Sequence, residues 1–442
     1  MKHESMKWRT LRLFELPILL GLLLAVFCSG INSVSFHSDE SQWIATSSFF
    51  EAFITGDFDS PIWNENYWNL TQPQVPRYVI ALGRIAGGYH AADINRPWEY
   101  NFSDTIPWER QRTINIAKGN MPSPELLWWS RLPMAILASF SGLLLFTVVC
   151  AFASRPAGYI FLVLFAGNSY FLTMLRRAMG ESPLLGFLTL ATVAGIQAVN
   201  SWQRTAIGTP RFWKPYLRPF AWFMIMGIGC GTAGEAKISG LSSILSGIAL
   251  STLVAFTNKN DISKSKRSIF AACTSVMFIL VVGWSFVAWN PFLYQDPFRR
   301  TEKMFGQRLK ELQIQQQGTG SWARIQDLDT RIKIVSQRIF QDYTVLNFPG
   351  VRIMHLLLCA AGLCYLGRRV WRWFRGGESQ AAGVVILLMV LTTGVPPLFT
   401  PLDWDRYYLL PVIFSTIFSA VGLAWAITAF LELVHCKLLT RT

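Results

Sequence analysis

The chain has 442 residues, of which 52% are hydrophobic and only 15% are charged, a composition that excludes an ordinary soluble domain and indicates a polytopic membrane protein. Its formal net charge of +14 would suit a nucleic-acid partner, but the basic residues fall in short turns between apolar runs, as the positive-inside rule predicts. We therefore expect membrane lipids, and no nucleic acid, as partners.

Ten apolar runs approach the length of about 20 residues that is needed to cross the hydrocarbon core of a bilayer. They are residues 13–35, 132–153, 157–175, 183–200, 219–235, 238–257, 268–289, 351–367, 380–399 and 408–433. The sequence therefore predicts an all-α polytopic membrane protein, a bundle of about 10–12 transmembrane helices.

The basic turns set the expected orientation of the bundle. If the N-terminus is cytoplasmic, three of these turns lie on the cytoplasmic side: Arg204/Arg211/Lys214/Arg218, Lys259/Lys264/Lys266/Arg267 and Arg368/Arg369/Arg372/Arg375. The non-cytoplasmic side then receives two long loops, 36–130 and 290–350, and three short connections, 176–182, 236–237 and 400–407. We expect a multi-pass protein of the cell inner membrane or plasma membrane with its non-basic polar chemistry on the non-cytoplasmic face.

Polar residues begin again at HSDESQW, residues 37–43, directly after the first apolar run. Two adjacent carboxylates, Asp39 and Glu40, therefore stand at the mouth of a membrane span. A solvated loop or a helix cap would account for such a pair, and so would a catalytic base at the membrane surface.

Three segments of the loops are predicted to form amphipathic helices. In the first loop, SQWIATSSFFEAFITG (41–56) and RYVIALGRIAGGY (77–89) carry apolar residues at near-helical spacing. In the second loop, FRRTEKMFGQRLKELQIQQQ (298–317) precedes the breaker GTGS. Its apolar stripe consists of Phe298, Met304, Phe305, Leu309 and Leu312.

Two arginines break the charge rule in LRRAMGESP, residues 175–183, because this connection is expected on the non-cytoplasmic side. Arg176 and Arg177 either extend to lipid headgroups, with Glu181 as a solvated counter-charge, or bind an anionic group such as phosphate. In the second case, Glu181 helps to place a reacting or coordinating group.

Two later segments also place charges at the ends of spans, where ionisable groups are costly. GTAGEAKISG contains Glu235 and Lys237, which a buried ion pair would explain nearly as well as a functional site. PLDWDRYYLLP, residues 401–411, combines Arg406 and Tyr407 with two aspartates, and an aromatic belt at the membrane interface is the alternative. Carboxylates, arginines and a lysine at one face suit a reaction in which a phosphate-linked lipid loses its head group to an acceptor hydroxyl.

Several motifs resemble the dolichyl-phosphate-mannose protein mannosyltransferases and their bacterial relatives, glycosyltransferase family 39 within the C-type fold. HSDE resembles the acidic motif of the first loop, and WNLTQPQVPRYVIALGR resembles the segment after it, although QPQVPR replaces the usual histidine and two adjacent prolines. Further similar segments are WWSRLPMAILASFSG, RRAMGESPLLGFLTLA, AKISGLSSIL, NPFLYQDP and WDRYYLLP. No long insertion after position 300 resembles the β-trefoil domain of eukaryotic members, which implies a bacterial or archaeal type.

The resemblance implies a C-type glycosyltransferase bundle, with residues 1–442 as one transmembrane catalytic domain. It implies that Asp39 is the general base, that Glu181 is a second acidic site residue and that Arg77 contacts the donor phosphate. The other implied phosphate contacts are Arg176, Lys237 and Arg406, and the implied supporting residues are Glu40, Gln72 and Tyr407.

The implied reaction moves a sugar from a polyprenyl phosphate donor to a hydroxyl of a protein, glycan or lipid acceptor at the non-cytoplasmic face, with inversion. No fixed cofactor is implied. Some relatives bind a divalent metal ion, which Glu181 would hold, and others need none, in which case Glu181 would orient Asp39.

Two other classes of protein share part of this pattern. A lipid or sugar transporter or flippase also has about ten spans and intramembrane charges, but it often shows internal pseudo-symmetry and polar residues near span midpoints. A non-catalytic membrane scaffold would explain the amphipathic helices, but not outward-facing arginines beside a glutamate.

Overall fold

The computed structural model describes residues 4–100, 107–205, 214–257, 264–317, 323–325, 327–346, 348, 350–375 and 381–439. Within these residues the chain is helical, and the pairing of extended segments is limited to an isolated bridge between Arg324 and Leu402. The α-helices are α1 (Glu4–Ser29), α2 (Ser38–Ala45), α3 (Phe49–Ile54), α4 (Tyr67–Thr71), α5 (Val75–Ala86), α6 (Trp108–Ala117), α7 (Pro124–Phe152), α8 (Arg155–Ala166), α9 (Ser169–Arg176), α10 (Glu181–Thr205), α11 (Lys214–Ala236), α12 (Ser243–Thr257), α13 (Lys264–Ala288), α14 (Pro297–Gln317), α15 (Leu328–Gln337), α16 (Val351–Phe374), α17 (Ala381–Met389) and α18 (Leu409–Leu439).

Eight helical segments in the described ranges are long and apolar enough to cross a membrane. They contain α1, α7, α10, α12, α13, α16, α17 and α18. A ninth span results if α8 and α9 count as one, since these helices meet at a bend of 68°. The chain is a multi-pass integral membrane protein, as its sequence predicts.

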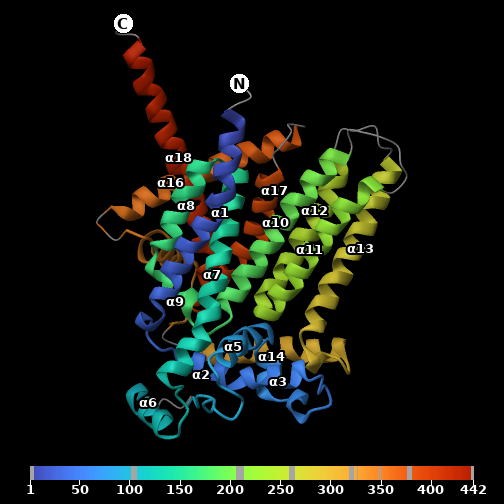
Figure 1. Cartoon of the computed structure of the whole chain (residues 1–442), viewed down its shortest axis with the longest axis vertical. Coiled ribbons are helices and arrows are strands. Elements are labelled where there is room, and N and C mark those ends of the chain that lie inside the picture. The colour runs from blue at the N-terminus through green and yellow to red at the C-terminus, as the bar shows by residue number, and fades with distance from the viewer. Residues whose placement is uncertain are drawn as a thin grey trace.

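Helix α11 corresponds to the predicted span 219–235, although it is not among the helices that qualify by length and composition. It packs along α10 and α13 in the same bundle (Figure 1). The described ends of α1 and α18 lie at the same end of the bundle, which requires an even number of crossings. Ten segments, with α11 and the bent pair included, satisfy this requirement.

The bend between α8 and α9 has a local cause. Gly167 ends α8, and Asn168 begins α9 by accepting a hydrogen bond from the backbone N–H of Tyr170 on its side-chain oxygen (2.9 Å). Such a cap satisfies a donor that the first turn of a helix leaves free. The chain thereby changes direction inside an apolar run that the sequence predicts as one span, 157–175.

Short helices form a layer across the end of the bundle that lies opposite the termini. Figure 1 shows α2, α3, α5, α6 and α14 in this layer. The predicted helices at 298–317 and 77–89 are confirmed as α14 and α5. The predicted helix 41–56 is instead divided among α2, a 3₁₀ turn (Thr46–Ser48) and α3. Gly56, at which the predicted helix ends, has a φ of +71°.

The layer is held to the bundle by a small apolar cluster. Ile44 of α2, Ile80 of α5, and Leu126 and Met134 of α7 are all buried together with Ala178. Burying apolar surface contributes roughly 25 cal/mol per Å², so this cluster fixes α2 against the end of α7. Because α2 carries Asp39 and Glu40, the cluster also fixes the position of both carboxylates.

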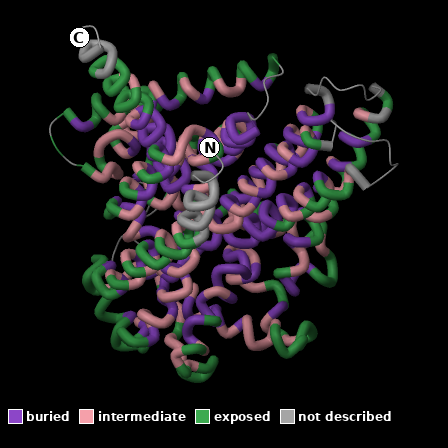
Figure 2. The backbone as a smooth tube through the Cα atoms, turned by 45° about the horizontal axis from the view of Figure 1, so that its top comes forward, coloured by how far each residue is buried: buried purple, intermediate pink, exposed green. Residues whose placement is uncertain are grey.

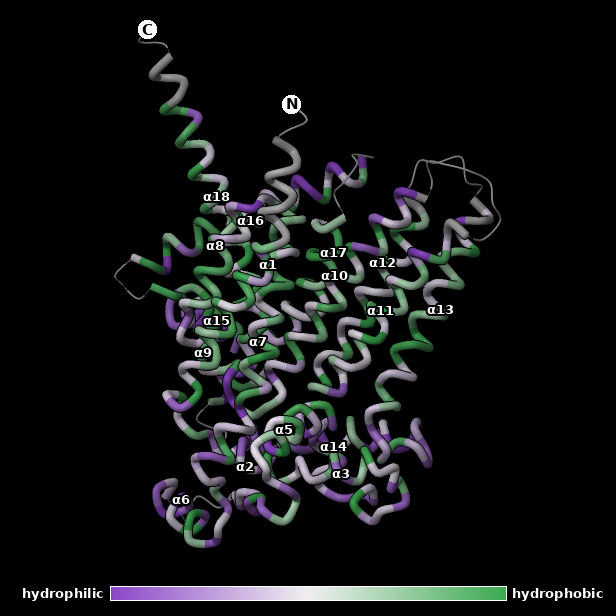
Figure 3. Tube along the Cα trace, viewed as in Figure 1, coloured by the Kyte–Doolittle hydropathy of each residue, from purple (hydrophilic) through white to green (hydrophobic). Residues whose placement is uncertain are grey.

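Burial and hydropathy follow the architecture. Buried residues run through the centre of the bundle (Figure 2), and hydrophobic segments occupy its middle, with hydrophilic residues gathered at both ends (Figure 3). On α14, only Met304 of the five predicted stripe residues is buried, whereas Phe298 and Leu309 are 89% and 62% exposed. The predicted stripe of α14 therefore faces mainly outward.

Two of the basic turns used to predict orientation fall partly outside the described residues, at 206–213 and 258–263, whereas the third, Arg368/Arg369/Arg372/Arg375, lies at the described end of α16, just before residues 376–380, which are not described. The described helix ends that flank these segments lie at the same end of the bundle as the described ends of α1 and α18 (Figure 1). This arrangement agrees with the predicted grouping of the basic turns on one side.

Candidate active site

A cavity of ≈ 950 Å³ opens between the short-helix layer and the bundle. Its walls come from α2, α4, the connection before α10, residues 236–242, α14 and residues 393–410. Polar and charged lining residues include His37, Ser38, Asp39, Gln42, Gln72, Tyr100, Arg177, Glu181, Lys237, Arg308, Glu311, Asp405, Arg406 and Tyr407. Apolar lining residues include Met174, Leu184, Ile238, Leu409 and Leu410. Segments that are far apart in sequence therefore meet around one polar space with an apolar wall.

The HSDE motif begins α2 and determines where its carboxylates point. Glu40 Oε2 accepts a hydrogen bond from the His37 backbone N–H (2.9 Å), and His37 Nδ1 accepts one from the Asp39 N–H (3.2 Å). This reciprocal pair is a capping box, with histidine in the place usually taken by serine or threonine. Successive residues of a helix point about 100° apart, so Asp39 faces the cavity while Glu40 faces the protein interior.

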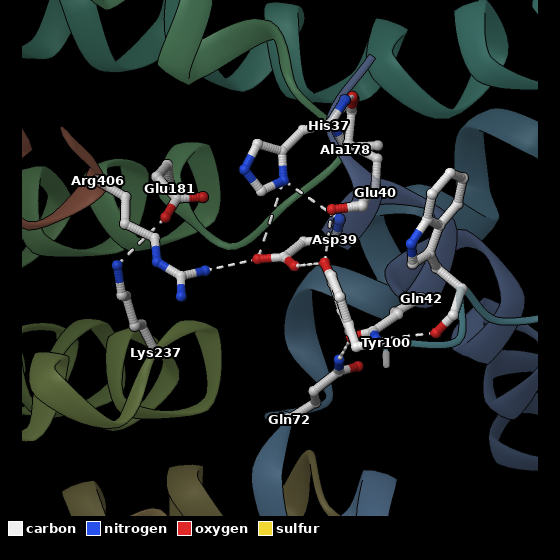
Figure 4. Close-up of polar contacts among 12 residues, drawn as sticks. His37, Asp39, Glu40, Gln42, Gln72, Tyr100, Ala178, Glu181, Lys237 and Arg406 are labelled. Atoms are coloured by element: carbon white, nitrogen blue, oxygen red, sulfur yellow. Dashed lines mark hydrogen bonds and ion pairs between the residues drawn. The ribbon is translucent and has the colours of Figure 1, made fainter. Parts of the chain in front are cut away.

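Both carboxylate oxygens of Asp39 are engaged at the cavity wall (Figure 4). Oδ1 accepts a hydrogen bond from the Tyr100 hydroxyl, and Oδ2 lies 2.7 Å from Arg406 Nη1 and 3.9 Å from His37 Nδ1. Burial alone would raise the pKa of Asp39, but the charge of Arg406, followed by His37 and Tyr100, lowers it to about 2. Asp39 is therefore ionised at neutral pH.

Aromatic rings hold the partner of Asp39. Arg406 lies over the ring of Trp404 (4.8 Å to the centroid) and near that of Tyr407 (5.9 Å), and these two rings stack on each other. Burial would lower the pKa of Arg406, but Asp39 and other nearby groups raise it overall. The predicted site residues Arg406 and Tyr407 thus meet Asp39 in the cavity. The alternative, an aromatic belt at the interface, does not account for the ion pair.

Glu181 and Lys237 form a second acid–base pair in the same cavity. Lys237 Nζ donates to Glu181 Oε1 over 3.2 Å, and Glu181 Oε2 is buried without a hydrogen-bond partner in the described structure. Lys237 also lies 5.7 Å from the centre of the Tyr407 ring. The alternative that Lys237 pairs with Glu235 is wrong, because Glu235 instead accepts hydrogen bonds from the Gln74 backbone N–H (3.0 Å) and Asn290 (3.2 Å).

Glu40 has no contact with the cavity. Its oxygens accept hydrogen bonds from Arg131 Nε (2.7 Å) and Nη2 (2.6 Å), from the Ala178 N–H (2.9 Å) and from the His37 N–H (2.9 Å). Glu40 is fully buried and Arg131 is 2% exposed. This pair joins α2 to α7 and to the connection before α10, so Glu40 supports the site by positioning its elements.

Gln72 lines the cavity and connects α4 to α2. Its Nε2 donates to Gln42 Oε1 (3.3 Å), and its Oε1 accepts from Thr46 Oγ1 (3.5 Å). Gln72 therefore belongs to a chain of hydrogen-bonded side chains beside the cavity, and its supporting role stays a prediction.

Two predicted phosphate contacts lie outside the cavity lining. Arg77 is fully buried and donates to Gln74 Oε1 (2.9 Å) and the Trp68 carbonyl (2.6 Å), with its guanidinium over the Phe49 ring. Arg176 is 6% exposed and donates to the carbonyls of Val26 (2.6 Å) and Phe27 (2.9 Å) at the end of α1. A cation at a helix C-terminus is stabilised by the helix dipole. In this structure both arginines therefore tie local elements together.

Arg177, rather than its neighbour, lines the cavity. Its Nε is buried without a hydrogen-bond partner, and no ion pair of this side chain occurs among the described residues. Arg308 of α14 also lines the cavity, where Nη1 contacts Glu311 (3.0 Å) and Nη2 contacts the Tyr407 hydroxyl (3.4 Å). The sequence does not show that Arg308 reaches the cavity, nor which of the two arginines in RRAMGESP faces it.

Among the residues that the structure describes, no group of three or more His, Cys, Asp or Glu side chains is arranged to hold a metal ion. Glu181 contacts Lys237. That Glu181 holds a metal ion or orients Asp39 stays a prediction.

Sequence comparison relates the middle of the chain to one family. Residues 110–294 match the family model described as dolichyl-phosphate-mannose-protein mannosyltransferase. This family is the one that the motifs resemble. The match covers less than half of the chain and ends before Arg406. No curated protein matches the chain in sequence.

Several solved structures are similar to the chain, among them the following two. The apo oligosaccharyltransferase of Archaeoglobus fulgidus is 13% identical, with a TM-score of 0.50 over 96% of this chain and 51% of that one. The protein O-mannosyltransferase Pmt1-Pmt2 complex of S. cerevisiae, bound to the sugar donor, is 17% identical, with a TM-score of 0.42 over 65% of this chain and 34% of that one. The chain thus spans about half the length of the archaeal protein. It shares its helical arrangement, in agreement with the predicted C-type glycosyltransferase fold.

Proposed function

We propose that the protein is a membrane glycosyltransferase that moves a sugar such as mannose from a polyprenyl phosphate donor to an acceptor hydroxyl. The observation that carries the proposal is the joining of Asp39–Arg406 and Glu181–Lys237 in one cavity. These pairs come from four distant parts of a chain whose residues 110–294 match a mannosyltransferase family. The acceptor is the hydroxyl of a protein, a glycan or another lipid.

The donor phosphate is assigned to the cations of the cavity. Arg177, Lys237 and Arg406 all line it, and phosphate binds arginine through two parallel hydrogen bonds and lysine through its compact charge. Apolar side chains of the same wall, including Leu184 and Leu409, suit the first part of the lipid tail. Arg77 and Arg176, which face elsewhere, are not part of this proposal.

Asp39 is assigned as the general base. It takes the proton of the acceptor hydroxyl as that oxygen bonds to the anomeric carbon, and the bond from this carbon to the phosphate oxygen breaks with its electron pair on the phosphate. One displacement inverts the configuration of the sugar. The cations stabilise the charge that develops on the leaving phosphate.

The position of the cavity supports activity at the non-cytoplasmic face. It lies at the end of the bundle opposite the helix ends that flank the basic turns (Figure 1), and basic turns mark the cytoplasmic side. Charged cavity residues at one end, rather than near span midpoints, also favour a transferase over a transporter or flippase.

One assay separates the candidate functions. The purified chain is incubated in lipid vesicles with labelled polyprenyl phosphate sugars, with and without acceptor alcohols or peptides, and both transfer and movement of the donor between leaflets are measured. A transferase yields labelled acceptor and free polyprenyl phosphate. Leaflet exchange without transfer would identify a flippase, and neither activity would favour a scaffold.

A further inference from the structure

The ion pair between Asp39 and Arg406 opposes the role given to each residue. A general base is stronger when no cation holds its charge, yet Asp39 Oδ2 lies 2.7 Å from Arg406 Nη1 while Oδ1 accepts from Tyr100. A phosphate contact is stronger when the charge of the arginine is not already paired, yet Arg406 is paired with Asp39. In this structure, the ion pair therefore weakens Asp39 as a base and Arg406 as a phosphate contact.

The geometry allows this pair to part. The side chains of Arg406 and Asp39 are 23% and 19% exposed, and both line the cavity. Arg406 lies against the rings of Trp404 and Tyr407, and because these contacts use the face of the guanidinium, its N–H groups remain directed outward in its plane, where an anion can bind. By contrast, the Glu40–Arg131 pair is sealed and has no such freedom.

The changes of charge during sugar transfer favour movement of Arg406 from Asp39 to the phosphate. Before transfer the donor is a phosphodiester with one negative charge, and Asp39 is ionised. The acceptor proton then neutralises Asp39, while the leaving polyprenyl phosphate becomes a monoester whose charge approaches −2, as for other phosphate monoesters at neutral pH. One negative charge therefore moves from Asp39 to the phosphate.

We propose that Arg406 passes from Asp39 to the donor phosphate when the donor binds, so that the donor itself releases the base. This inference rests on the proposed function and deepens it. Arginine forms a two-pronged contact with phosphate, and Lys237 and Arg177 of the same cavity remain to share the charge. The acceptor is then activated only when a donor is in place, which suppresses abstraction of its proton without transfer.

The groups that face Asp39 define what else would influence its protonation. They are His37 at the start of α2, Tyr100 from the segment before α6, Tyr67 of α4, and Arg406. Glu181 pairs with Lys237 in the same cavity and also influences Arg406. Of these groups, Arg406 is the cation that pairs directly with Asp39 among the described residues.

The test measures protonation of Asp39 without measuring turnover. A hydrophobic carbodiimide modifies protonated carboxyl groups, and mass spectrometry of the Asp39 peptide gives the pH of half-modification. In the parent protein, adding polyprenyl phosphate should raise this pH by about one unit or more, the usual effect of losing a close arginine. In Arg406→Gln the value should already be raised, and the lipid should add little.

Two results would overturn the inference. One is an unchanged or lowered pH of half-modification in the parent when the lipid is added. The other is an equal lipid-induced rise in Arg406→Gln, since this would show a direct effect of phosphate on Asp39. Arg299→Gln, which removes an exposed cation of α14, is the matched control and should behave as the parent.

A second variant keeps the test decisive if Arg406→Gln does not fold. Arg406→Lys retains the charge but cannot bind phosphate through two parallel N–H groups. The lipid-induced rise in the pH of half-modification of Asp39 should therefore be less than half of the parental rise. An undiminished rise in this variant would overturn the proposal that Arg406 moves from Asp39 to the phosphate. If polyprenyl phosphate raises the pH of half-modification of Asp39 in the parent but the parent never transfers sugar, the proposed function is refuted. The inference that Arg406 moves to phosphate would then still stand.

Discussion

Asp39 and Glu40 are neighbours in sequence, but their side chains point in different directions and differ in burial. Asp39 faces the cavity, where its partner Arg406 is itself accessible, whereas Glu40 is sealed beside Arg131 with four donors around its oxygens. The step of about 100° between the two residues separates a group that lines the cavity from a group that holds three elements together. This pair of adjacent acids is therefore one cavity residue and one structural residue.

The arginines at 176 and 177 repeat this division. Arg176 caps the end of α1, and Arg177 lines the cavity with its Nε unpartnered. In both pairs, the structural member is buried and hydrogen-bonded to a neighbouring element. The contrast can be tested by removing the same charge from each neighbour.

The largest effect is expected for Asp39→Asn. General-base catalysis typically contributes about 10²- to 10⁴-fold, so the turnover number should fall by that factor while the variant remains folded at neutral pH and still binds donor, with its unfolding temperature lowered only by the loss of the Asp39–Arg406 pair. Single-turnover transfer in vesicles measures the rate, and a labelled polyprenyl phosphate analogue measures the affinity. Transfer at the parental rate would show that Asp39 is not the base.

Glu40→Gln should instead damage the fold. Removing one partner of a buried ion pair costs about 3–5 kcal/mol, and Arg131 would be left without its counter-charge. Thermal unfolding in detergent should show this loss. Glu99→Gln is the control, because its pair with Lys118 is mostly exposed and should contribute less than about 1 kcal/mol. A Glu40 variant as stable as this control would contradict the assignment.

The arginine pair gives the next test. Arg177→Ala should raise KM for the donor by about 10- to 100-fold, the value of a charged hydrogen-bond contact, with little loss of stability. Arg176→Ala should lower the unfolding temperature, and the folded fraction should bind donor normally. Donor binding measured on both purified variants decides the question, and the reverse pattern would favour the original expectation for Arg176.

The smallest effect concerns acid pH. Because the pKa of Asp39 is lowered to about 2 in the folded protein from an ordinary value of 3.8, its ion pair stabilises the fold above about pH 4. This contribution, about 2 kcal/mol, is lost as pH falls from about 4 toward 2. The difference in unfolding temperature between parent and Asp39→Asn should shrink over that window, and a constant difference would argue against the pairing.

The sequence predicts the spans well because about 20 apolar residues have few alternatives to a membrane helix. It also predicts that Asp39, Glu181, Lys237 and Arg406 lie at one face, since loop charges define sidedness. It does not predict side-chain direction: nothing in RRAMGESP distinguishes Arg176 from Arg177. Arg77 occupies the position at which the resemblance implies a phosphate contact, yet tertiary packing directs its side chain toward Gln74 and Trp68.

Long-range partners were equally hidden from the sequence. Asp39 and Arg406 are 367 positions apart, and the bend at Asn168 that shapes this end of the bundle interrupts an apolar run that appears continuous. Tyr100 precedes α6 and Arg308 lies on α14, and the packing of both segments depends on many weak contacts. Their place in the cavity follows from the fold rather than from any local pattern.

The most direct test of the account is the stereochemistry of a transferred sugar. The purified chain in vesicles is supplied with an anomerically pure, labelled polyprenyl phosphate mannose and an acceptor alcohol, and the product is analysed by NMR. The account predicts transfer with inverted anomeric configuration, since a single base assists one displacement. Retention of configuration, or no transfer from polyprenyl phosphate sugars by protein that binds them, would contradict it.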